Sequence, residues 1–419
     1  MIDFKKKKIL VLGGGSVHNK VVEAAREMGI YSIVADYYAE DRAPAKKLAD
    51  EAVMLSVTDV DAIVEFCKHN NVDGIVNCCN DPAQVPYQKA CKHLGLPCYG
   101  TEEQFSILTN KIRFKRFCVD HGVDVIPEYT KEDILTDNVQ YPIFIKPSNG
   151  RGSRGQTICY NKEQAHTAIK VAEEESSEGK MICEKYMGDC QDIGSAFFVV
   201  AGEPYLVKFG DRHLGNKEDY LDRQVICTRL PSVHAPELEN TTIKKVKQMI
   251  KALGVQFGPV FLQGFIDGDT IRYYDPGMRM PGGDYDRILK KATGFDTVKS
   301  LIHFALTGDY TFAYGKPEDC YKLNGGVAVL ICFCVRPGKI ARITGMDKLL
   351  EDPRVVYGRQ NLNEGDIVPA SGDVQQRVAA AGVYVPAGEN VNELIDYVYN
   401  TYHVLDEYGK DMIVSKVYC

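Results

Sequence analysis

Short apolar runs alternate with amphipathic segments along the first hundred residues of the chain. The runs predict strands and the segments between them predict helices, because apolar positions three or four residues apart build one face of a helix. The predicted strands are Ile9–Leu12, Tyr31–Ala35, Gly74–Asn77 and Leu96–Tyr99, and the predicted helices cover 18–28, 59–70 and 83–94. This alternation is typical of a parallel sheet with helices on both faces, so we expect a doubly wound α/β domain over 1–105.

Three glycines, Gly13, Gly14 and Gly15, follow the first predicted strand, and Asp36 stands 21 positions after the last of them. A dinucleotide-binding fingerprint would need a further glycine at the position of His18, so the fingerprint is incomplete. Two interpretations remain. One is a tight turn, and the other, which we prefer, is an anion or substrate site at the helix N-terminus to which Gly14 contributes.

Asn80 and Asp81 follow the strand predicted at Gly74–Asn77. Open α/β sheets bind their ligands beyond the carboxyl ends of the strands. The two side chains are therefore candidates for substrate contact, and a turn with a helix cap explains them equally well.

A cationic, glycine-rich segment begins where another predicted strand ends. The apolar run Ile143–Ile145 leads into Lys146, whose ammonium is costly to bury unless an anion meets it. The following residues, up to Gly155, supply backbone N–H groups and the side chains of Ser153 and Arg154. They predict a mobile flap over a polyphosphate, although the Walker motif is absent and a solvated hairpin turn is the alternative.

Two further stretches are consistent with a nucleotide. Residues 105–121 predict a helix that carries Lys111, with a strand near Val123–Ile126. Met181–Met187 predicts an edge-like strand that runs into a polar turn, where exposed backbone groups can bond an adenine edge. Asp192 follows at a position suited to ribose hydroxyls.

In this order of elements the chain resembles the ATP-grasp superfamily, whose members clamp ATP between two α+β lobes. The resemblance is carried by Lys111, "FIKPSNGRGSRG", "CEKYM" and "GPVFLQGFIDGDTIRYYDPGMRMPGG". It implies that phosphates are held by Lys111, Lys146, Ser153, Arg154 and Gly155. It also implies that adenine is bound by Glu184, Lys185, Tyr186 and Met187, and ribose by Asp192.

The same resemblance implies a metal hairpin for Mg²⁺ or Mn²⁺. Family members usually carry an acidic residue on one strand and E-x-N-x-R on the next, where this chain has Gln263 and then Asp275-Pro276-Gly277-Met278-Arg279. By resemblance, Asp275 is the main metal ligand and the amide oxygen of Gln263 assists. Arg279, which stabilises the charged intermediate, and Lys146 are the catalytic residues that the resemblance implies. Gly277 offers no ligand, which leaves the second metal open.

The turn of this hairpin decides whether the two ligands can meet. A three-residue loop, 267–269, would pair Gln263 with Tyr273 and leave Asp275 diagonally adjacent on the same face. A two-residue turn would put Gln263 and Asp275 on opposite faces and end the assignment.

Basic residues gather between the nucleotide and metal elements, in 208–231. They are either ordinary surface residues or ligands of a substrate carboxylate, for which the arginine fork is well suited. The members are Lys208, Arg212, His213, Arg223 and Arg229. The candidate substrate contacts are Gly14, Asn80, Asp81, Arg212, His213, Arg279, Gly282 and Gly283.

The last hundred residues predict further strands and a final amphipathic helix. Together with "MPGGDYDRILKKATGFD", this tail resembles the amino-acid ligase branch of the superfamily. We therefore expect a pre-ATP-grasp domain over 1–105, an ATP-grasp domain over 106–310 (small lobe about 115–187, large lobe from 188) and a C-terminal α+β part over 311–419 that packs on the large lobe.

The resemblance implies an ATP-dependent carboxylate–amine ligase that works through an acyl phosphate and is a homodimer. Two alternatives stay open: an ATP-grasp carboxylase or carbamoyl-phosphate-synthase-like enzyme, and a non-catalytic nucleotide sensor, which Gly277 motivates.

The composition of the chain argues against nucleic acid and membrane as its main partners. The chain has 419 residues, of which 45% are hydrophobic and 26% charged, with a net charge of −7 that argues against a mainly nucleic-acid-binding surface. No apolar stretch approaches the ~18 residues of a membrane helix, and no secretory pattern begins the chain, so we expect a cytoplasmic protein with small-molecule substrates. The fourteen cysteines lack zinc-site spacing, and we expect them to be reduced and structural.

Overall fold

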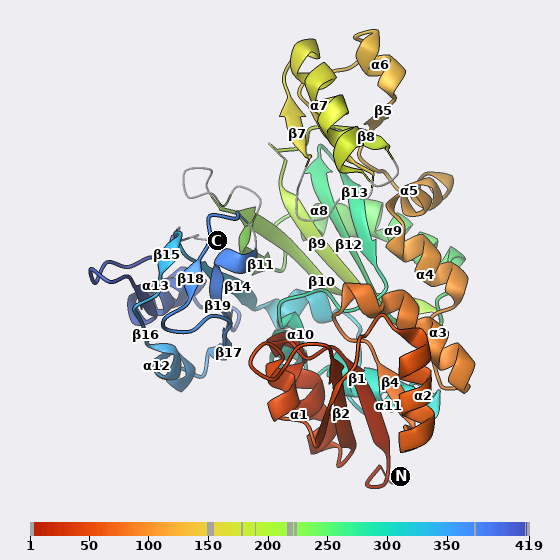
Figure 1. The fold of residues 1–419 in the computed structure, drawn as a ribbon, viewed down its shortest axis with the longest axis vertical. Coiled ribbons are helices and arrows are strands. Elements are labelled where there is room, and N and C mark those ends of the chain that lie inside the picture. Colours follow the sequence, from red (N-terminus) through yellow and green to blue (C-terminus); the bar gives the residue numbers. More distant parts are fainter. Residues whose placement is uncertain are drawn as a thin grey trace.

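The computed structural model (Figure 1) describes residues 4–148, 155–176, 179–188, 190–215, 221, 224–372, 374–414 and 416. Within these ranges, no helix combines the length and apolar character needed to cross a membrane.

The first part of the chain forms the predicted parallel sheet, with strand order β3-β2-β1-β4. Its strands are β1 (Lys8–Leu12), β2 (Tyr31–Asp36), β3 (Glu51–Met54) and β4 (Gly74–Val76), and its helices are α1 (Asn19–Glu27), α2 (Val60–Asn70) and α3 (Gln84–Leu94). The predicted strand Leu96–Tyr99 does not form. Tyr99 instead donates its hydroxyl to the carbonyl oxygens of Asn77 and Met278, at 3.1 Å each, so side-chain contacts anchor this segment.

The helix predicted over 105–121 is two helices, α4 (Glu102–Thr109) and α5 (Lys111–Asp120). Asn110 separates them with an extended backbone, and its side-chain oxygen accepts from the N–H groups of Ile112 and Arg113 at 3.1 and 3.0 Å. This cap makes Lys111 the first residue of α5 and holds it at the start of a helix. The strand expected near Val123–Ile126 reduces to one isolated bridge between Val125 and Tyr273.

A four-stranded antiparallel sheet forms the small lobe, at the top of Figure 1, with strand order β5-β8-β6-β7. Its strands are β5 (Glu128–Tyr129), β6 (Ile143–Pro147), β7 (Thr157–Cys159) and β8 (Met181–Lys185), with α6 (Lys131–Leu135) and α7 (Lys162–Glu175). The lobe has its own core, which includes Ile143, Ile145 and Ala168.

The prediction of an edge strand at Met181–Met187 is wrong. β5 pairs with β8, so that Glu128 lies opposite Glu184 and Tyr129 opposite Cys183. β8 therefore has a neighbour on each side at these positions. The local pattern missed β5 because it is only two residues long.

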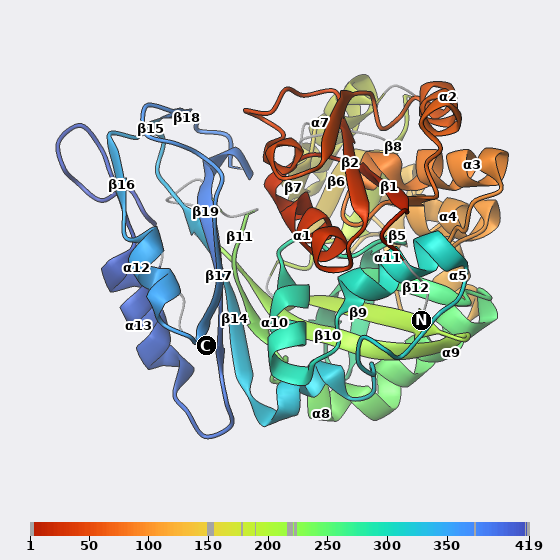
Figure 2. The ribbon, with the colours of Figure 1, turned by 90° about the horizontal axis from the view of Figure 1, so that it is seen from below.

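An antiparallel sheet of eight strands crosses the rest of the molecule, in the order β13-β12-β9-β10-β11-β14-β19-β17. The strands are β9 (Asp192–Val200), β10 (Glu203–Leu214), β11 (Val225–Leu230), β12 (Phe257–Asp267), β13 (Thr270–Gly277), β14 (Val327–Cys334), β17 (Val355–Gln360) and β19 (Arg377–Val385). Figure 2 shows that β14, β19 and β17 run on from the large lobe, so the C-terminal part continues the same sheet.

Helices cover this sheet and join it to the first domain. In the large lobe these are α8 (Ala235–Leu238), α9 (Lys244–Ala252), α10 (Tyr285–Thr293) and α11 (Thr297–Thr307), with a π-helical turn at Glu239–Ile243. α11 packs against α1, β1 and β4, so the first domain and the large lobe share one hydrophobic core.

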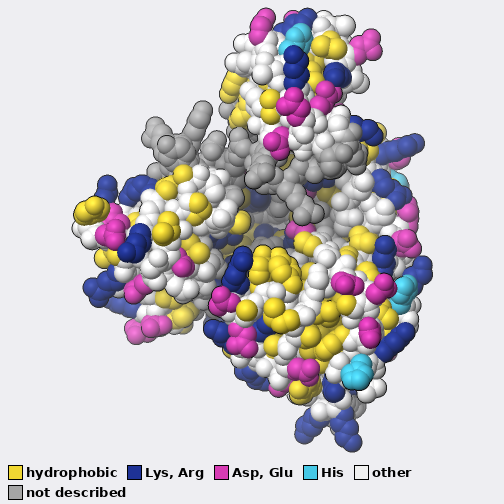
Figure 3. Space-filling model, viewed as in Figure 1, with side chains coloured by type: hydrophobic (Ala, Val, Ile, Leu, Met, Phe, Trp, Pro, Cys, Tyr) yellow, Lys and Arg dark blue, Asp and Glu magenta, His cyan; other side chains and the backbone are white. Residues whose placement is uncertain are grey.

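The C-terminal part has a second core, covered by α13 (Val391–Thr401). Its remaining elements are β15 (Gly338–Lys339), β16 (Arg342–Thr344), α12 (Met346–Glu351), β18 (Ile367–Val368) and β20 (His403–Leu405). The space-filling view shows a recess between the small lobe, the first domain and the C-terminal part (Figure 3).

Candidate active site

The hairpin β12–β13 places Gln263 directly opposite Asp275. Its turn has two residues, since Asp267 pairs with Thr270, so the predicted three-residue loop is wrong. The two-residue turn by itself would separate the two side chains. A bulge at Tyr274 adds one residue to β13 and shifts the register between Gln263 and Gly264, which returns both side chains to one face of the sheet.

Gly277 lies opposite Phe261 in the same hairpin. A Cβ at this glycine would stand 1.9 Å from the Phe261 ring, so the ring fills the space that an asparagine side chain would need. The guanidinium of Arg279 lies over the same ring, 4.5 Å from the centre of Phe261. The hairpin therefore carries an aromatic support for Arg279 where the family pattern has a second metal ligand.

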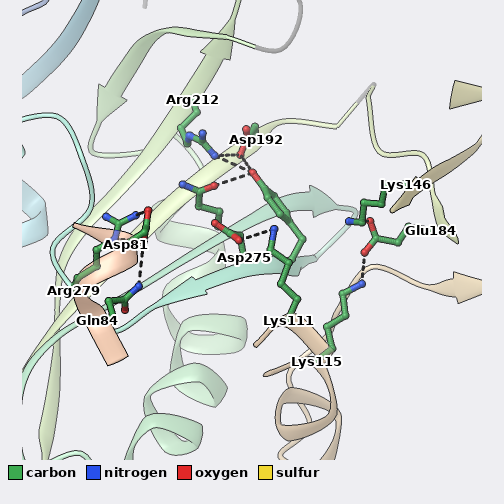
Figure 4. Close-up of polar contacts among 12 residues, drawn as sticks. Asp81, Gln84, Lys111, Lys115, Lys146, Glu184, Asp192, Arg212, Asp275 and Arg279 are labelled. Atoms are coloured by element: carbon green, nitrogen blue, oxygen red, sulfur yellow. Dashed lines mark hydrogen bonds and ion pairs between the residues drawn. The ribbon is translucent and has the colours of Figure 1, made fainter. Parts of the chain in front are cut away.

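Asp275 forms an ion pair with Lys111, the first residue of α5 (Figure 4). The Nζ atom of Lys111 lies 3.0 Å from Oδ1 of Asp275, which is partly exposed. No group of three His, Cys, Asp or Glu side chains suited to a metal forms among the described residues. The Asp275 carboxylate and the Gln263 amide nevertheless fit Mg²⁺, which is commonly held by one or two carboxylates together with substrate phosphates and water.

Lys146 belongs to a buried triad on the small lobe, shown at the right of Figure 4. Its Nζ donates to Oε2 of Glu184 at 2.5 Å, and Lys115 donates to the other oxygen. Burial opposes ionisation of Glu184, but the two ammonium groups outweigh it and hold the pKa of this carboxyl below its usual range. The Glu184 side chain is thus bound to lysines, which leaves only its backbone for an adenine contact.

The two lobes approach each other at this point. Burial lowers the pKa of Lys146, and the ammonium groups of Lys115 and Lys111 lower it further, while Glu184 opposes the shift. Lys111 is at the same time the ion-pair partner of Asp275. The cationic end of β6 and the carboxylate of β13 therefore share a neighbour, and their side chains face one region.

The other residues predicted to bind ATP differ in whether the structure describes them and in whether their groups are free to bind a nucleotide. Ser153 and Arg154 lie outside the described residues, and Gly155 has a positive φ of 66°. The backbone N–H groups of Lys185 and Tyr186 donate to Pro127 and Pro142, so neither is free for a base in this conformation. The Lys185 side chain reaches Asp267 at 3.5 Å, and Met187 is buried.

Asp192 is bound within the protein as well. Arg212 donates to its carboxylate at 2.9 Å and to the Tyr274 hydroxyl at 3.0 Å, and this hydroxyl lies 3.2 Å from Oε1 of Gln263. Burial raises the pKa of Asp192 to about 6 although Arg212 opposes the shift. The bulged Tyr274 thus connects the ribose candidate to the metal candidate.

Arg279 and Asp81, both predicted to contact substrate, pair with each other. Nη2 of Arg279 lies 2.6 Å from Oδ2 of Asp81 (Figure 4). The backbone N–H of Met278 donates to Oε1 of Gln84 at 2.8 Å. These contacts join the first domain to the end of β13. They also position the arginine next to the metal hairpin.

The predicted anion site at Gly14 is not available in this conformation. The Gly14 N–H donates to Oδ2 of Asp36 at 2.7 Å, so it does not point outward as expected. Asn80 donates to the carbonyl of Leu12 at 3.4 Å. Both residues therefore stabilise the turn after β1.

A cavity of about 280 Å³ lies on the concave face of the large sheet beside Gln263. Its lining includes the predicted residues Arg212, Gly282 and Gly283. His213 does not line it, because neighbouring residues of a strand point to opposite faces. Arg223 lies outside the described residues, and Arg229 donates to the carbonyl of Pro231.

Two basic residues around this cavity, Arg359 of β17 and Arg377 of β19, were not predicted as candidate ligands of the substrate. Lys208, which also lines it, belongs to the predicted basic segment. The C-terminal arginines carry no local motif, and they reach the cavity because their strands join the large sheet.

Lys208 allows a test of charge burial by pH. Burial lowers the pKa of its ammonium from 10.5 to about 7. Between these values the unfolded chain binds the proton and the folded chain does not, so the free energy of unfolding rises with pH. We therefore expect the free energy of unfolding of wild type, measured in urea, to rise by about 2 kcal/mol relative to that of Lys208→Met between pH 7 and pH 9. Lys245→Met, at an exposed lysine, is the control, and its free energy of unfolding should differ from that of wild type by the same amount at both pH values. A difference between wild type and Lys208→Met that does not change with pH would contradict the assigned burial.

The chain is similar in sequence to several known proteins. The family model described as "Carbamoyl-phosphate synthase L chain, ATP binding domain" matches residues 108–200. This span contains Lys111, Lys146, Glu184 and Asp192. The 2-oxoglutarate carboxylase small subunit of Hydrogenobacter thermophilus is 27% identical over 240 residues, which cover 52% of this chain and 49% of the relative. The chain spans about half the length of the first curated relatives it matches.

Solved structures share the whole fold at low identity. The biotin carboxylase domain dimer of Hydrogenobacter thermophilus 2-oxoglutarate carboxylase, in complex with MgADP, ADP and bicarbonate, has a TM-score of 0.75 at 19% identity, over 95% of this chain and 90% of that one. L-amino acid ligase from Bacillus licheniformis has a TM-score of 0.75 at 16% identity, over 96% and 99%. The chain shares its fold with these structures, and the proteins to which it is similar include carboxylases, formyltransferases and an L-amino acid ligase.

Proposed function

We propose that the chain is an ATP-dependent carboxylate–amine ligase that forms an amide through an acyl phosphate. The observation that carries the proposal is the ion pair of Lys111 with Asp275, which Figure 4 shows in the same part of the molecule as the pair of Lys146 with Glu184. Cations on one side and a metal-binding carboxylate on the other are what a magnesium–triphosphate unit needs.

The proposed reaction has two steps. An oxygen of the substrate carboxylate attacks the γ-phosphorus of ATP, the bond from this phosphorus to the β–γ bridging oxygen breaks, and ADP leaves. An amine nitrogen then attacks the acyl carbon, the bond from carbon to the phosphate oxygen breaks, and phosphate and a proton are released. The chain contributes chiefly by holding the reactants and balancing charge, with little need for a general base.

Each residue group has a role in this scheme. Lys111 and Lys146 hold phosphates, and Asp275 with Gln263 holds Mg²⁺ or Mn²⁺, which when bound neutralises charge on the transferring phosphoryl group. Because Phe261 fills the space beside Gly277, we propose one metal ion at this hairpin. Arg279, supported by Phe261 and aligned by Asp81, stabilises the charged intermediate.

We further propose a cytoplasmic homodimer. The Hydrogenobacter thermophilus domain that shares this fold is a dimer, which supports this oligomeric state.

A carboxylase is the second candidate, favoured by the relatives that are carboxylases. Bicarbonate would then be the acid that is phosphorylated, and no free amine would be consumed.

A phosphate-release screen separates the two candidates. Carboxylic acids are incubated with the protein, ATP, Mg²⁺ and hydroxylamine, which converts an acyl phosphate into a hydroxamate. We expect ADP and hydroxamate to appear in equal amounts with one class of organic acid. ADP release that depends on bicarbonate alone would establish the second candidate, and nucleotide binding with no turnover across the panel would refute both.

A further inference from the structure

The cavity beside Gln263 is surrounded by more positive than negative charge. Four cationic side chains from three strands line it: Lys208 and Arg212 on β10, Arg359 on β17 and Arg377 on β19, and none of the described lining residues is a carboxylate. Its volume of about 280 Å³ is just below the ~300–1,000 Å³ of common ligand pockets, so one small molecule fills it.

Two of these cations are neutralised within the protein. Arg212 pairs with Asp192 at 2.9 Å, and Arg359 pairs with Asp284 at 2.7 Å. The third nearby carboxylate, Asp286, is bound by the buried Lys20 of α1. Among the described residues, these three carboxylates near the cavity are therefore already paired with cations.

The other two cations lack a carboxylate partner in the part of the chain that the structure describes. Lys208 is 7% exposed, and its Nζ faces the ring of Tyr285 at 5.2 Å. Arg377 donates from Nη2 to the carbonyl of Val225 at 3.5 Å, and its buried Nε has no hydrogen-bond partner. An unpaired buried cation is costly, and an incoming anion removes that cost.

The position of Arg377 separates it from the reacting end of the cavity. Gln263 lies on β12, in the metal hairpin, whereas β19 is five strands further along the sheet and Lys208 of β10 lies between them. A carboxylate that is phosphorylated near Gln263 cannot at the same time be the partner of Arg377. The cavity thus has a reacting end and a distal anion-binding end.

We propose that the acid substrate carries, besides the carboxylate that is phosphorylated, a second anionic group bound by Lys208 and Arg377. This inference rests on the proposed ligase function and names the substrate class of the same site. The second group is a carboxylate or a phosphate ester, which share the chemistry that these cations recognise. The low pKa of Lys208, which burial causes and the nearby Arg212 increases, agrees with this assignment, because a bound anion would stabilise the ammonium form.

The test uses the full chain with ATP, Mg²⁺ and hydroxylamine, and no amine substrate. Hydroxamate formation is measured for α,ω-dicarboxylates, for their matched monoamides, and for carboxylates that end in a phosphate ester. We expect kcat/KM for a doubly anionic acid to exceed that of its singly charged match at least tenfold, mainly through KM. Preference for the phosphate ester over the dicarboxylate would identify the second group as phosphate.

Variants assign the effect to the cavity. Arg377→Met and Lys208→Met should each lower the ratio of kcat/KM between the diacid and its monoamide at least tenfold, and Arg377→Lys should restore part of it. Arg342→Met, on an exposed part of β16, is the matched control and should leave the ratio unchanged.

Failure of this inference is distinct from failure of the ligase proposal. Hydroxamate formed equally from diacids and monoamides, with ratios that Arg377→Met does not change, overturns the second anionic group and leaves the ligase in place. Nucleotide binding without hydroxamate from any acid overturns the ligase and this inference together.

Discussion

Replacement of Asp275 by asparagine is expected to lower kcat for acid-dependent ADP formation about 10³-fold. The change removes the single carboxylate that the hairpin offers to a metal, and loss of charge stabilisation of about 4 kcal/mol corresponds to this factor. Saturating acid and ATP isolate the effect on kcat, and a Mn²⁺ titration followed by electron paramagnetic resonance reports metal affinity directly. We expect weaker metal binding as well as slower turnover.

The fold should survive this change. Asp275 is partly exposed, and its pair with Lys111 is of the kind that contributes less than about 1 kcal/mol to stability. Asp269→Asn, at the exposed turn of the same hairpin, is the matched control and should retain wild-type turnover. If Asp275→Asn turns over like wild type with normal metal affinity, the metal hairpin is assigned wrongly.

Replacement of Lys146 by methionine should lower kcat/KM for ATP at least 100-fold. The variant keeps the stem that packs in β6 but removes the ammonium at the end of the strand. Glu184 stays neutralised because Lys115 still pairs with it, so the loss reports on the nucleotide rather than on an orphaned carboxylate. Steady-state kinetics and equilibrium binding of a fluorescent ATP analogue separate the effects on binding and on turnover.

The control for Lys146 is Lys170→Met, an exposed lysine on α7 of the same lobe, which should bind ATP normally. A double variant, Lys146→Met with Asp275→Asn, tests whether both groups act on one nucleotide. Its loss should be smaller than the product of the two single losses, since groups that act as a unit are not additive. Strictly multiplicative losses would mean that the two groups serve separate sites.

Several functional positions were predictable from local pattern. Lys146 was placed at the end of a strand by the apolar run before it, and it lies next to the last residue of β6, where its ammonium pairs with Glu184. Arg279 and Asp81 were both predicted to contact substrate, although the sequence did not show that they pair with each other. Glu184 was selected for a backbone contact, and its side chain instead balances two lysines.

Other features depended on contacts between distant segments. The register of the metal hairpin rested on a bulge at Tyr274, which a count of turn residues could not reveal. β8 became an inner strand because the two-residue β5 pairs with it. Arg359 and Arg377 reach the cavity only because β14 pairs with β11 and carries the C-terminal strands into the sheet.

The sequence by itself determined the alternation of strands and helices in the first domain, the cationic strand end at Lys146 and the donors of the hairpin. These follow from periodicity and residue chemistry over a few neighbouring positions. The tertiary structure decided which donors face each other and which cations line the cavity. Those outcomes depend on strand pairing and register, which are determined by contacts between residues far apart in the chain.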